Sequence, residues 1–162
     1  MTHDLRRHDL EITDSAEIDR LLSSAKFASV ALADGEEPYL VTLSCGYDAA
    51  KGRLCFHVAP NGRKLDIIAK NPRGCATVVH DLGYKAGECA HPYASVVLFG
   101  HLRVLDDPAD AREAMRTLIG QLESPEDESA IWARNLLDTE AGLARCRMLA
   151  FEIEDLTAKA GQ

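Results

Sequence analysis

Apolar residues recur along this chain at two spacings, one typical of helices and one typical of strands. The helical spacing begins after Asp14, a common N-cap residue, and Glu17 three positions later completes the pattern of a capping box. Residues three and four apart then share one helical face: Ile18, Leu21, Leu22 and Ala25. We therefore expect an amphipathic helix over about 14–25.

Alternation of apolar and polar positions predicts strands through the middle of the chain, because successive side chains of a strand point to opposite faces. The predicted strands cover residues 27–33, 39–47, 53–59, 74–81, 93–105 and 148–156. Asp34 followed by Gly35 is a strong turn signal between the first two. Gly100 lies inside the longest strand, where a glycine indicates a bulge or the close approach of another backbone.

Further helices are predicted over 63–70, 109–122 and 126–138. Because the strands follow one another at short spacing, the pattern favours an antiparallel barrel over alternating βαβ units. We predict a mainly β protein with peripheral helices. It forms a single domain over 1–162, with a polar N-terminal arm over about 1–13.

The charge of the chain narrows the classes of partner. The net charge of −8 comes from 26 acidic and 18 basic residues, so a phosphate-coated polymer is repelled on average and nucleic acid is not expected. No apolar run approaches the length that spans a bilayer, and the first 14 residues are too charged for the core of a signal peptide. We expect a cytoplasmic protein without membrane contact.

The cysteines number five, and none forms a CxxC pair. An odd number of cysteines in a chain without a signal peptide indicates free thiols, and a zinc site has little support. Cys45 and Cys55 lie on neighbouring predicted strands, where we expect them to pack in the core. Cys89 and His91 do not complete a coordination sphere, so no metal site is predicted.

The segment 56–66 runs from a strand through a glycine turn and two adjacent cations into a helix. A helix start offers free N–H groups and the positive end of the helix dipole. Arg63 adds a planar guanidinium and Lys64 a point charge, which together suit a phosphomonoester. The alternative is a solvated pair of cations on an exposed first turn.

His57 precedes that turn, on the strand face opposite Leu54, Phe56 and Val58. Its imidazole could stack on a ligand or deliver a proton near neutral pH. The alternative is a structural histidine held by hydrogen bonds.

Several segments in a fixed order resemble the pyridoxamine 5'-phosphate oxidase-like family of FMN-binding split barrels, and above all its branch of nitroimidazole-resistance flavoproteins. The matching blocks are 39–48, 52–59, 62–68, 71–72, 93–96 with Gly100, 151–153 and 156–159. The likeness covers about 18–159. It implies a six-stranded antiparallel split β-barrel, a homodimer, and FMN bound where two subunits meet.

The resemblance also implies contacts for the cofactor. By position, Arg63 and Lys64 would hold the FMN phosphate, and His57 and Val58 would lie beside the flavin and its ribityl chain. Ser95 would match a polar flavin contact on a later strand. Four consecutive residues would follow the isoalloxazine edge: Val41, Thr42, Leu43 and Ser44.

The function that this resemblance implies is an FMN-dependent oxidoreductase acting on a small molecule, such as a nitroaromatic or quinone-like acceptor, with NAD(P)H as a candidate electron donor. His57 is the nominated catalytic residue, for proton transfer. The end of the chain lacks the basic, substrate-binding tail of the oxidases themselves, so oxidation of the vitamin phosphate is not expected. The loop 82–91 is expected to cover the substrate side.

The same barrel is compatible with three alternative functions. One is a non-catalytic flavin-binding or electron-transfer protein. Another is a haem protein, for which His57, His91 and His101 are the candidate axial ligands. A third is a barrel that holds a deazaflavin.

Overall fold

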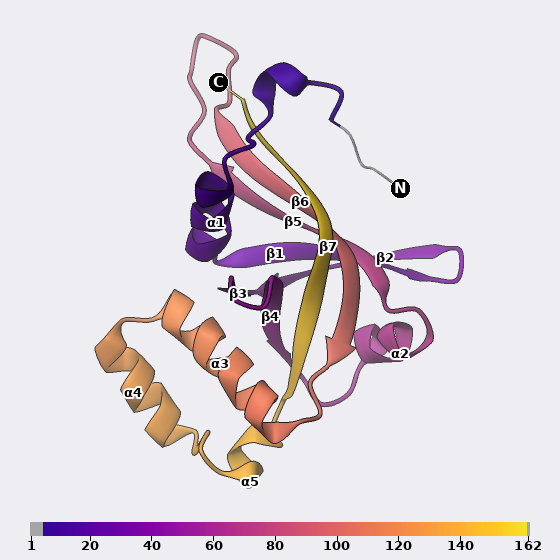
Figure 1. The fold of residues 1–162 in the computed structure, drawn as a ribbon, viewed down its shortest axis with the longest axis vertical. Helices are drawn as coiled ribbons and strands as arrows, with labels where there is room; N and C mark the ends of the chain where they lie inside the picture. The colour runs from indigo at the N-terminus through magenta and orange to yellow at the C-terminus, as the bar shows by residue number, and fades with distance from the viewer. Residues whose placement is uncertain (1–4, 162) are drawn as a thin grey trace.

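A curled antiparallel sheet of seven strands dominates the computed structural model, which describes residues 5–161 (Figure 1). The strand order is β2-β1-β5-β6-β7-β4-β3. The strands are β1 (Phe27–Asp34), β2 (Glu37–Ser44), β3 (Gly46–Asp48), β4 (Arg53–Val58), β5 (Arg73–Asp81), β6 (Tyr93–Val104) and β7 (Arg147–Gly161). β2 contacts β4 although the two are not paired, because the sheet curls until its two ends meet. The predicted barrel architecture is confirmed, with seven strands instead of six.

The extra strand arises where the sequence predicts one strand over 39–47. β2 pairs with β1, whereas β3 pairs with β4 at the other end of the sheet. Between them Cys45 is fully buried, and its N–H donates to the Lys26 carbonyl at 3.2 Å. Alternation of side chains continues through this point, so the pattern alone does not show that the pairing partner changes.

The helices are α1 (Ser15–Ser24), α2 (Arg63–Lys70), α3 (Pro108–Leu122), α4 (Pro125–Arg134) and α5 (Glu140–Leu143), after a short 3₁₀ helix, η1 (His8–Leu10). The Asp14 side chain caps α1 by accepting from the N–H of Ala16 at 3.1 Å. The helix predicted over 126–138 is wrong at its end, because Leu136 adopts a left-handed conformation with φ of 55°. None of the helices in residues 5–161 is long and apolar enough to cross a membrane.

Two apolar cores lie on opposite faces of the sheet. Leu54, Phe56 and Val58 face the core inside the barrel, which α1 and α2 complete. Cys55 faces the second core, where α3 and α4 cover β4 and β7. The two faces predicted for this strand are therefore confirmed. The predicted polar arm contains η1 and a bridge from Glu11 to Lys159, while its first four residues lie outside the described range.

The long ribbon of β6 and β7 curves through the whole molecule and carries the predicted irregularity at Gly100 (Figure 1). The register between the strands shifts between Phe99 and Gly100. A Cβ atom on Gly100 would overlap the carbonyl oxygen of Glu152. Both the bulge and the close approach are thus confirmed. β7 continues to Gly161, beyond the predicted end at residue 156, because β6 pairs with it throughout.

Candidate functional site

The start of α2 has the features of an anion site. Gly62 occupies the N-cap with φ of 141°, and it supplies no side-chain cap. Nothing lies within 4 Å of the position that a Cβ atom would take there, so the turn faces open space. The first N–H groups of a helix lack the usual intrahelical acceptor. In α2 the Leu65 N–H donates to the Gly62 carbonyl at 2.9 Å, so within residues 5–161 the N–H groups of Arg63 and Lys64 are the ones left for a ligand.

Two cations stand at this helix start. The Arg63 guanidinium is exposed, with its Cζ 5.3 Å from the ring centroid of Tyr39 on β2 and its Nη2 3.7 Å from the Asp34 carboxylate. The Lys64 side chain is half-buried and forms no ion pair or hydrogen bond with the rest of residues 5–161. A fork-shaped donor, a point charge and free helix amides are the donor set of a phosphomonoester site.

The predicted flavin-edge residues on β2 divide between the two faces of that strand. Val41 and Leu43 are half-buried and pack against the barrel core. Thr42 lies on the outer face, where its hydroxyl is 2.9 Å from the hydroxyl of Ser29. Ser44 ends the strand and lines a cavity.

That cavity, called here the helix cavity, encloses about 340 Å³ between β4 and the helices α3, α4 and α5. Of the nine predicted site residues it brings together Ser44 and His57. Its other lining residues come from the helical segment: Met115, Leu118, Ile119, Leu122, Glu123, Ile131, Asn135, Leu137, Gly142, Arg145 and Cys146. None of these residues is predicted from the sequence to belong to a site. The one sequence signal for this cavity is the apolar face of α3, and such a face predicts core packing instead of a binding site.

His57 and Val58 differ in environment although they are neighbours. Val58 is buried in the barrel core, which leaves its backbone as the group available to a ligand. The His57 imidazole is exposed at the helix cavity and has no hydrogen-bonding partner among residues 5–161. The structural alternative, in which hydrogen bonds hold this histidine, therefore has no support in the described part of the chain.

The other histidines proposed as ligands have partners. His91 Nε2 lies 2.8 Å from the carboxylate of Asp81, and His101 Nδ1 lies 2.8 Å from that of Glu154. His91 belongs to the loop 82–92, which projects beyond the ends of β5 and β6, far from the helix cavity (Figure 1). Within one copy the loop therefore does not cover that cavity.

Ser95 lies apart from the other predicted contacts. It pairs with Lys159 on β7, whereas His57 pairs with Met148 on the same strand. At about 3.3 Å per residue, the length of β7 between these partners is about 36 Å. Within one copy, Ser95 and His57 therefore lie beside opposite ends of β7.

Burial holds two thiols near the site in the neutral form, those of Cys45, between β2 and β3, and Cys55, on β4. Burial raises the pKa of Cys45 to about 11 and that of Cys55 to about 12. Both side chains are fully buried in the apolar cores, which confirms the expected packing role. No group of three or more histidine, cysteine or acidic side chains within residues 5–161 could hold a metal ion.

The family model of pyridoxamine 5'-phosphate oxidase matches residues 14–160. Three solved structures show the same fold at low identity. A flavocytochrome from Azotobacter vinelandii matches with a TM-score of 0.78 and 19% identity, over 99% of this chain and 73% of its own. A FAD and haem binding protein from Mycobacterium smegmatis matches with a TM-score of 0.76 and 20% identity, over 94% of this chain and 73% of its own.

The third structure is a candidate 5-nitroimidazole antibiotic resistance protein from Bacteroides thetaiotaomicron. It gives a TM-score of 0.75 and 18% identity, over 93% of this chain and 86% of its own. No curated protein matches the sequence significantly. These likenesses confirm the split-barrel fold.

Proposed function

Since the chain belongs to the pyridoxamine 5'-phosphate oxidase family, we propose that it binds FMN and acts as an oxidoreductase on a small molecule. The observation that carries the proposal is the start of α2, where Arg63 and Lys64 stand beside uncapped helix amides. This donor set fits the phosphate of FMN. Arg63 also contacts Tyr39, which connects the phosphate end to the strand proposed to follow the flavin ring.

When bound, the flavin supplies the two-electron chemistry, with NAD(P)H proposed as the donor and a nitroaromatic or quinone-like molecule as the acceptor. The chain's own residues bind and orient it. Val41, Thr42, Leu43 and Ser44 are proposed to offer backbone groups to the ring edge, as is Val58 to the ribityl chain. His57, exposed and without a partner in residues 5–161, is proposed to donate or accept the proton through an imidazole nitrogen.

A second copy of the chain belongs to this proposal. The outer face of β1, β5 and β6 contributes to neither apolar core of residues 5–161, and it exposes Phe27 and Val79, which are 59% and 60% accessible. Val79 pairs in register with Ser95. Ser95 lies on this face and is itself 7% accessible within one copy. A partner that covers the face would lie against this segment of β6, so we propose that Ser95 serves the flavin of the other subunit.

The five cysteines support a reducing compartment such as the cytoplasm, because all of them are free thiols. A haem in place of the flavin is the second candidate. It rests on His57, the one histidine of the three candidates without a side-chain partner in residues 5–161.

The first experiment is a visible spectrum of the purified protein, followed by titration of FMN and riboflavin into Arg63→Ala/Lys64→Ala. Two charge-assisted hydrogen bonds to phosphate are removed, so we expect FMN affinity to fall about 100-fold while riboflavin affinity changes little. Lys70→Ala is the control, because Lys70 is an exposed cation in the last turn of the same helix. Unchanged FMN affinity in the double variant would show that the phosphate site is wrong. A Soret band would favour haem.

A further inference from the structure

The helix cavity has an apolar floor that no proposed flavin contact uses. Met115 and Leu118 on α3 are 6% and 3% accessible, and Leu137 in the connection from α4 to α5 is 6% accessible. Ile131 on α4 is half-buried at the same cavity. A volume of about 340 Å³ lies at the lower end of the range for small-molecule pockets, which is roughly 300–1,000 Å³.

Polar groups gather at the rim. Arg145, in the segment after α5, and His57 on β4 both expose their side chains at this cavity. The Arg145 guanidinium forms no ion pair or side-chain hydrogen bond within residues 5–161. Asn135 donates through Nδ2 to the carbonyl of Ile131 at 2.9 Å, which orients its amide. The Arg145 guanidinium and the His57 imidazole therefore line the cavity without a protein acceptor in the described chain.

The other ionisable groups of the cavity are Glu123 and Cys146. Glu123 is exposed at the C-terminal end of α3 and opposes an anion by its charge. Burial raises the pKa of the Cys146 thiol, so this group stays uncharged at neutral pH. The donors at Arg145 and His57 thus face a single competing carboxylate.

We infer that the helix cavity binds a small apolar organic acid, with its ring or alkyl body among the floor residues and its carboxylate at Arg145 and His57. This goes beyond FMN binding, because only Ser44 and His57 are shared with the proposed flavin contacts. Arg145 suits the carboxylate, since a planar guanidinium binds it through two parallel hydrogen bonds.

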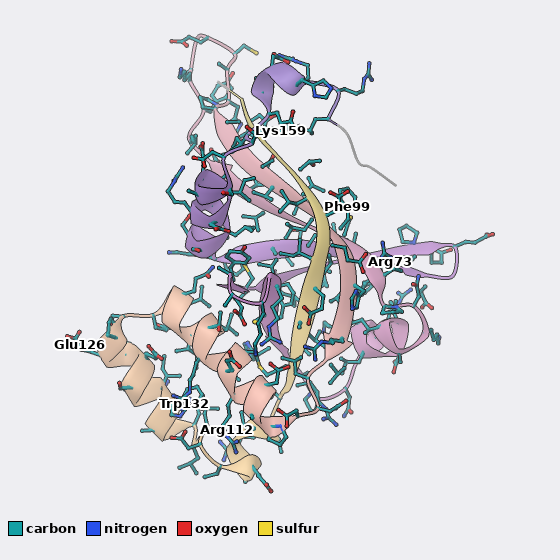
Figure 2. The ribbon with its side chains drawn as sticks, in the orientation of Figure 1. Arg73, Phe99, Arg112, Glu126, Trp132 and Lys159 are labelled. Atoms are coloured by element: carbon teal, nitrogen blue, oxygen red, sulfur yellow. The ribbon has the colours of Figure 1, made fainter. Side chains whose placement is uncertain are left out.

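The chain carries its own reporter for this site. Trp132 is the one tryptophan among 162 residues. It packs in the same apolar cluster as Met115, Ile119 and Leu137, and Figure 2 places it on α4 on the side toward α3. Trp132 does not itself line the cavity, but the lining residues Met115, Ile119 and Leu137 belong to its cluster. A molecule that displaces them changes the surroundings of the indole, so tryptophan fluorescence reports binding indirectly, and calorimetry measures it directly.

The test is a fluorescence and calorimetric titration of the purified protein, with and without added FMN. The probes are benzoate, 4-methylbenzoate and the neutral isostere 4-methylbenzamide. We expect saturable binding of both acids and binding of the amide that is about tenfold weaker, because it forfeits a charge-assisted hydrogen bond. Arg145→Gln should remove this preference, Glu123→Gln should strengthen binding of the acids, and Ile131→Phe should weaken all three probes.

Arg134→Gln is the matched control, because this exposed arginine ends α4 and does not line the cavity. Three results would overturn the inference. These are no saturable change with either acid, equal affinity for acid and amide that Arg145→Gln leaves unchanged, or complete displacement of the acids by FMN. Because Arg145 is exposed, its variant stays informative even if Ile131→Phe fails to fold.

Discussion

At the scale of the residue, Gly100 is the glycine of the described chain where an added Cβ atom would make the closest contact, 1.9 Å from a backbone oxygen. It lies where β6 and β7 change register, and the Glu152 carbonyl oxygen occupies the space of a Cβ atom. Any side chain there must push the two strands apart. Because these strands connect the two ends of the barrel, the displacement cannot stay local.

We therefore expect Gly100→Ala to lower the free energy of unfolding by about 2–3 kcal/mol, since overpacking of a close backbone contact forces both strands to shift. Urea denaturation measures it. Gly120→Ala is the control, and it should change the free energy of unfolding in the opposite direction. Gly120 lies inside α3 with only the Glu128 side chain near its Cβ position, so alanine should stabilise by up to about 1 kcal/mol. A neutral Gly100→Ala would contradict the close contact.

Features that depend on a single residue and its neighbours in sequence are predicted best. The N-cap at Asp14, the bulge at Gly100 and the two faces of the strand around Phe56 all follow from local rules of capping, backbone sterics and alternation. The exposure of His57 and its lack of a partner do not follow, because they depend on residues distant in sequence.

At the scale of the element, an ionic cluster holds α3 against the sheet. Arg53 on β4 is 1% accessible, and its Nε donates to Asp48 at 3.1 Å. Its Nη2 donates to Asp110 in the first turn of α3 at 2.7 Å. The hydrogen bond from Arg53 is the main reason that the pKa of Asp110 lies well below its usual range, and Lys51 adds to the effect. Since α3 forms the floor of the helix cavity, this cluster also positions the candidate site.

A carboxylate with a depressed pKa in the folded state stabilises the protein above its unfolded pKa, and this contribution is lost as the pH falls toward its folded pKa. Asp110→Asn should therefore lower the free energy of unfolding by about 2–3 kcal/mol at pH 7, because it leaves the buried Arg53 guanidinium with Asp48 as its one remaining charged partner. The deficit should shrink below about pH 4. Urea denaturation across this pH range measures both effects.

Glu113→Gln is the matched control. Glu113 accepts from Lys51 at 2.6 Å but is 55% accessible, so solvent screens the pair and the change should be about 0.5 kcal/mol or less. A deficit for Asp110→Asn that is the same at every pH would contradict the role of its charge.

Errors of prediction at this scale have a common cause. Residues 39–47 alternate correctly yet form two strands, because Cys45 is where the chain changes its pairing partner. The helix predicted to residue 138 stops at Arg134, and α5 follows a left-handed turn at Leu136. Local periodicity carries no information about tertiary partners. The helix cavity forms between segments distant in sequence, so local patterns do not predict it.

At the scale of the whole molecule, the outer face of β1, β5 and β6 decides the proposed assembly. If two copies meet there, Val79→Arg should place a charge in the interface and shift the dimer to monomer at micromolar concentration. Light scattering after size exclusion measures the mass. Leu136→Arg is the control, because Leu136 is 53% accessible but lies on the α4–α5 connection. A wild-type monomer would contradict the dimer, and an unaffected Val79→Arg dimer would contradict this interface.

The barrel itself was predictable from strand spacing and the family likeness, and the comparisons confirm it. The separation of Ser95 from His57 along β7 could not be predicted from the sequence, because a motif does not show which copy of the chain supplies each contact. The proposed dimer, in which two copies share the ligand, accounts for both the motif and the single-chain geometry.

β7 joins two groups of strands that are synthesised before it. β7 lies between β6 and β4 in the sheet, yet it is the last strand along residues 5–161. During synthesis, the four strands β2, β1, β5 and β6 and the hairpin of β4 and β3 emerge first, and no strand yet pairs one group with the other. Ribosome-bound chains therefore expose the edges of β6 and β4, which β7 later covers, until residues 147–161 leave the exit tunnel. A chaperone that shields strand edges would be most useful during this interval.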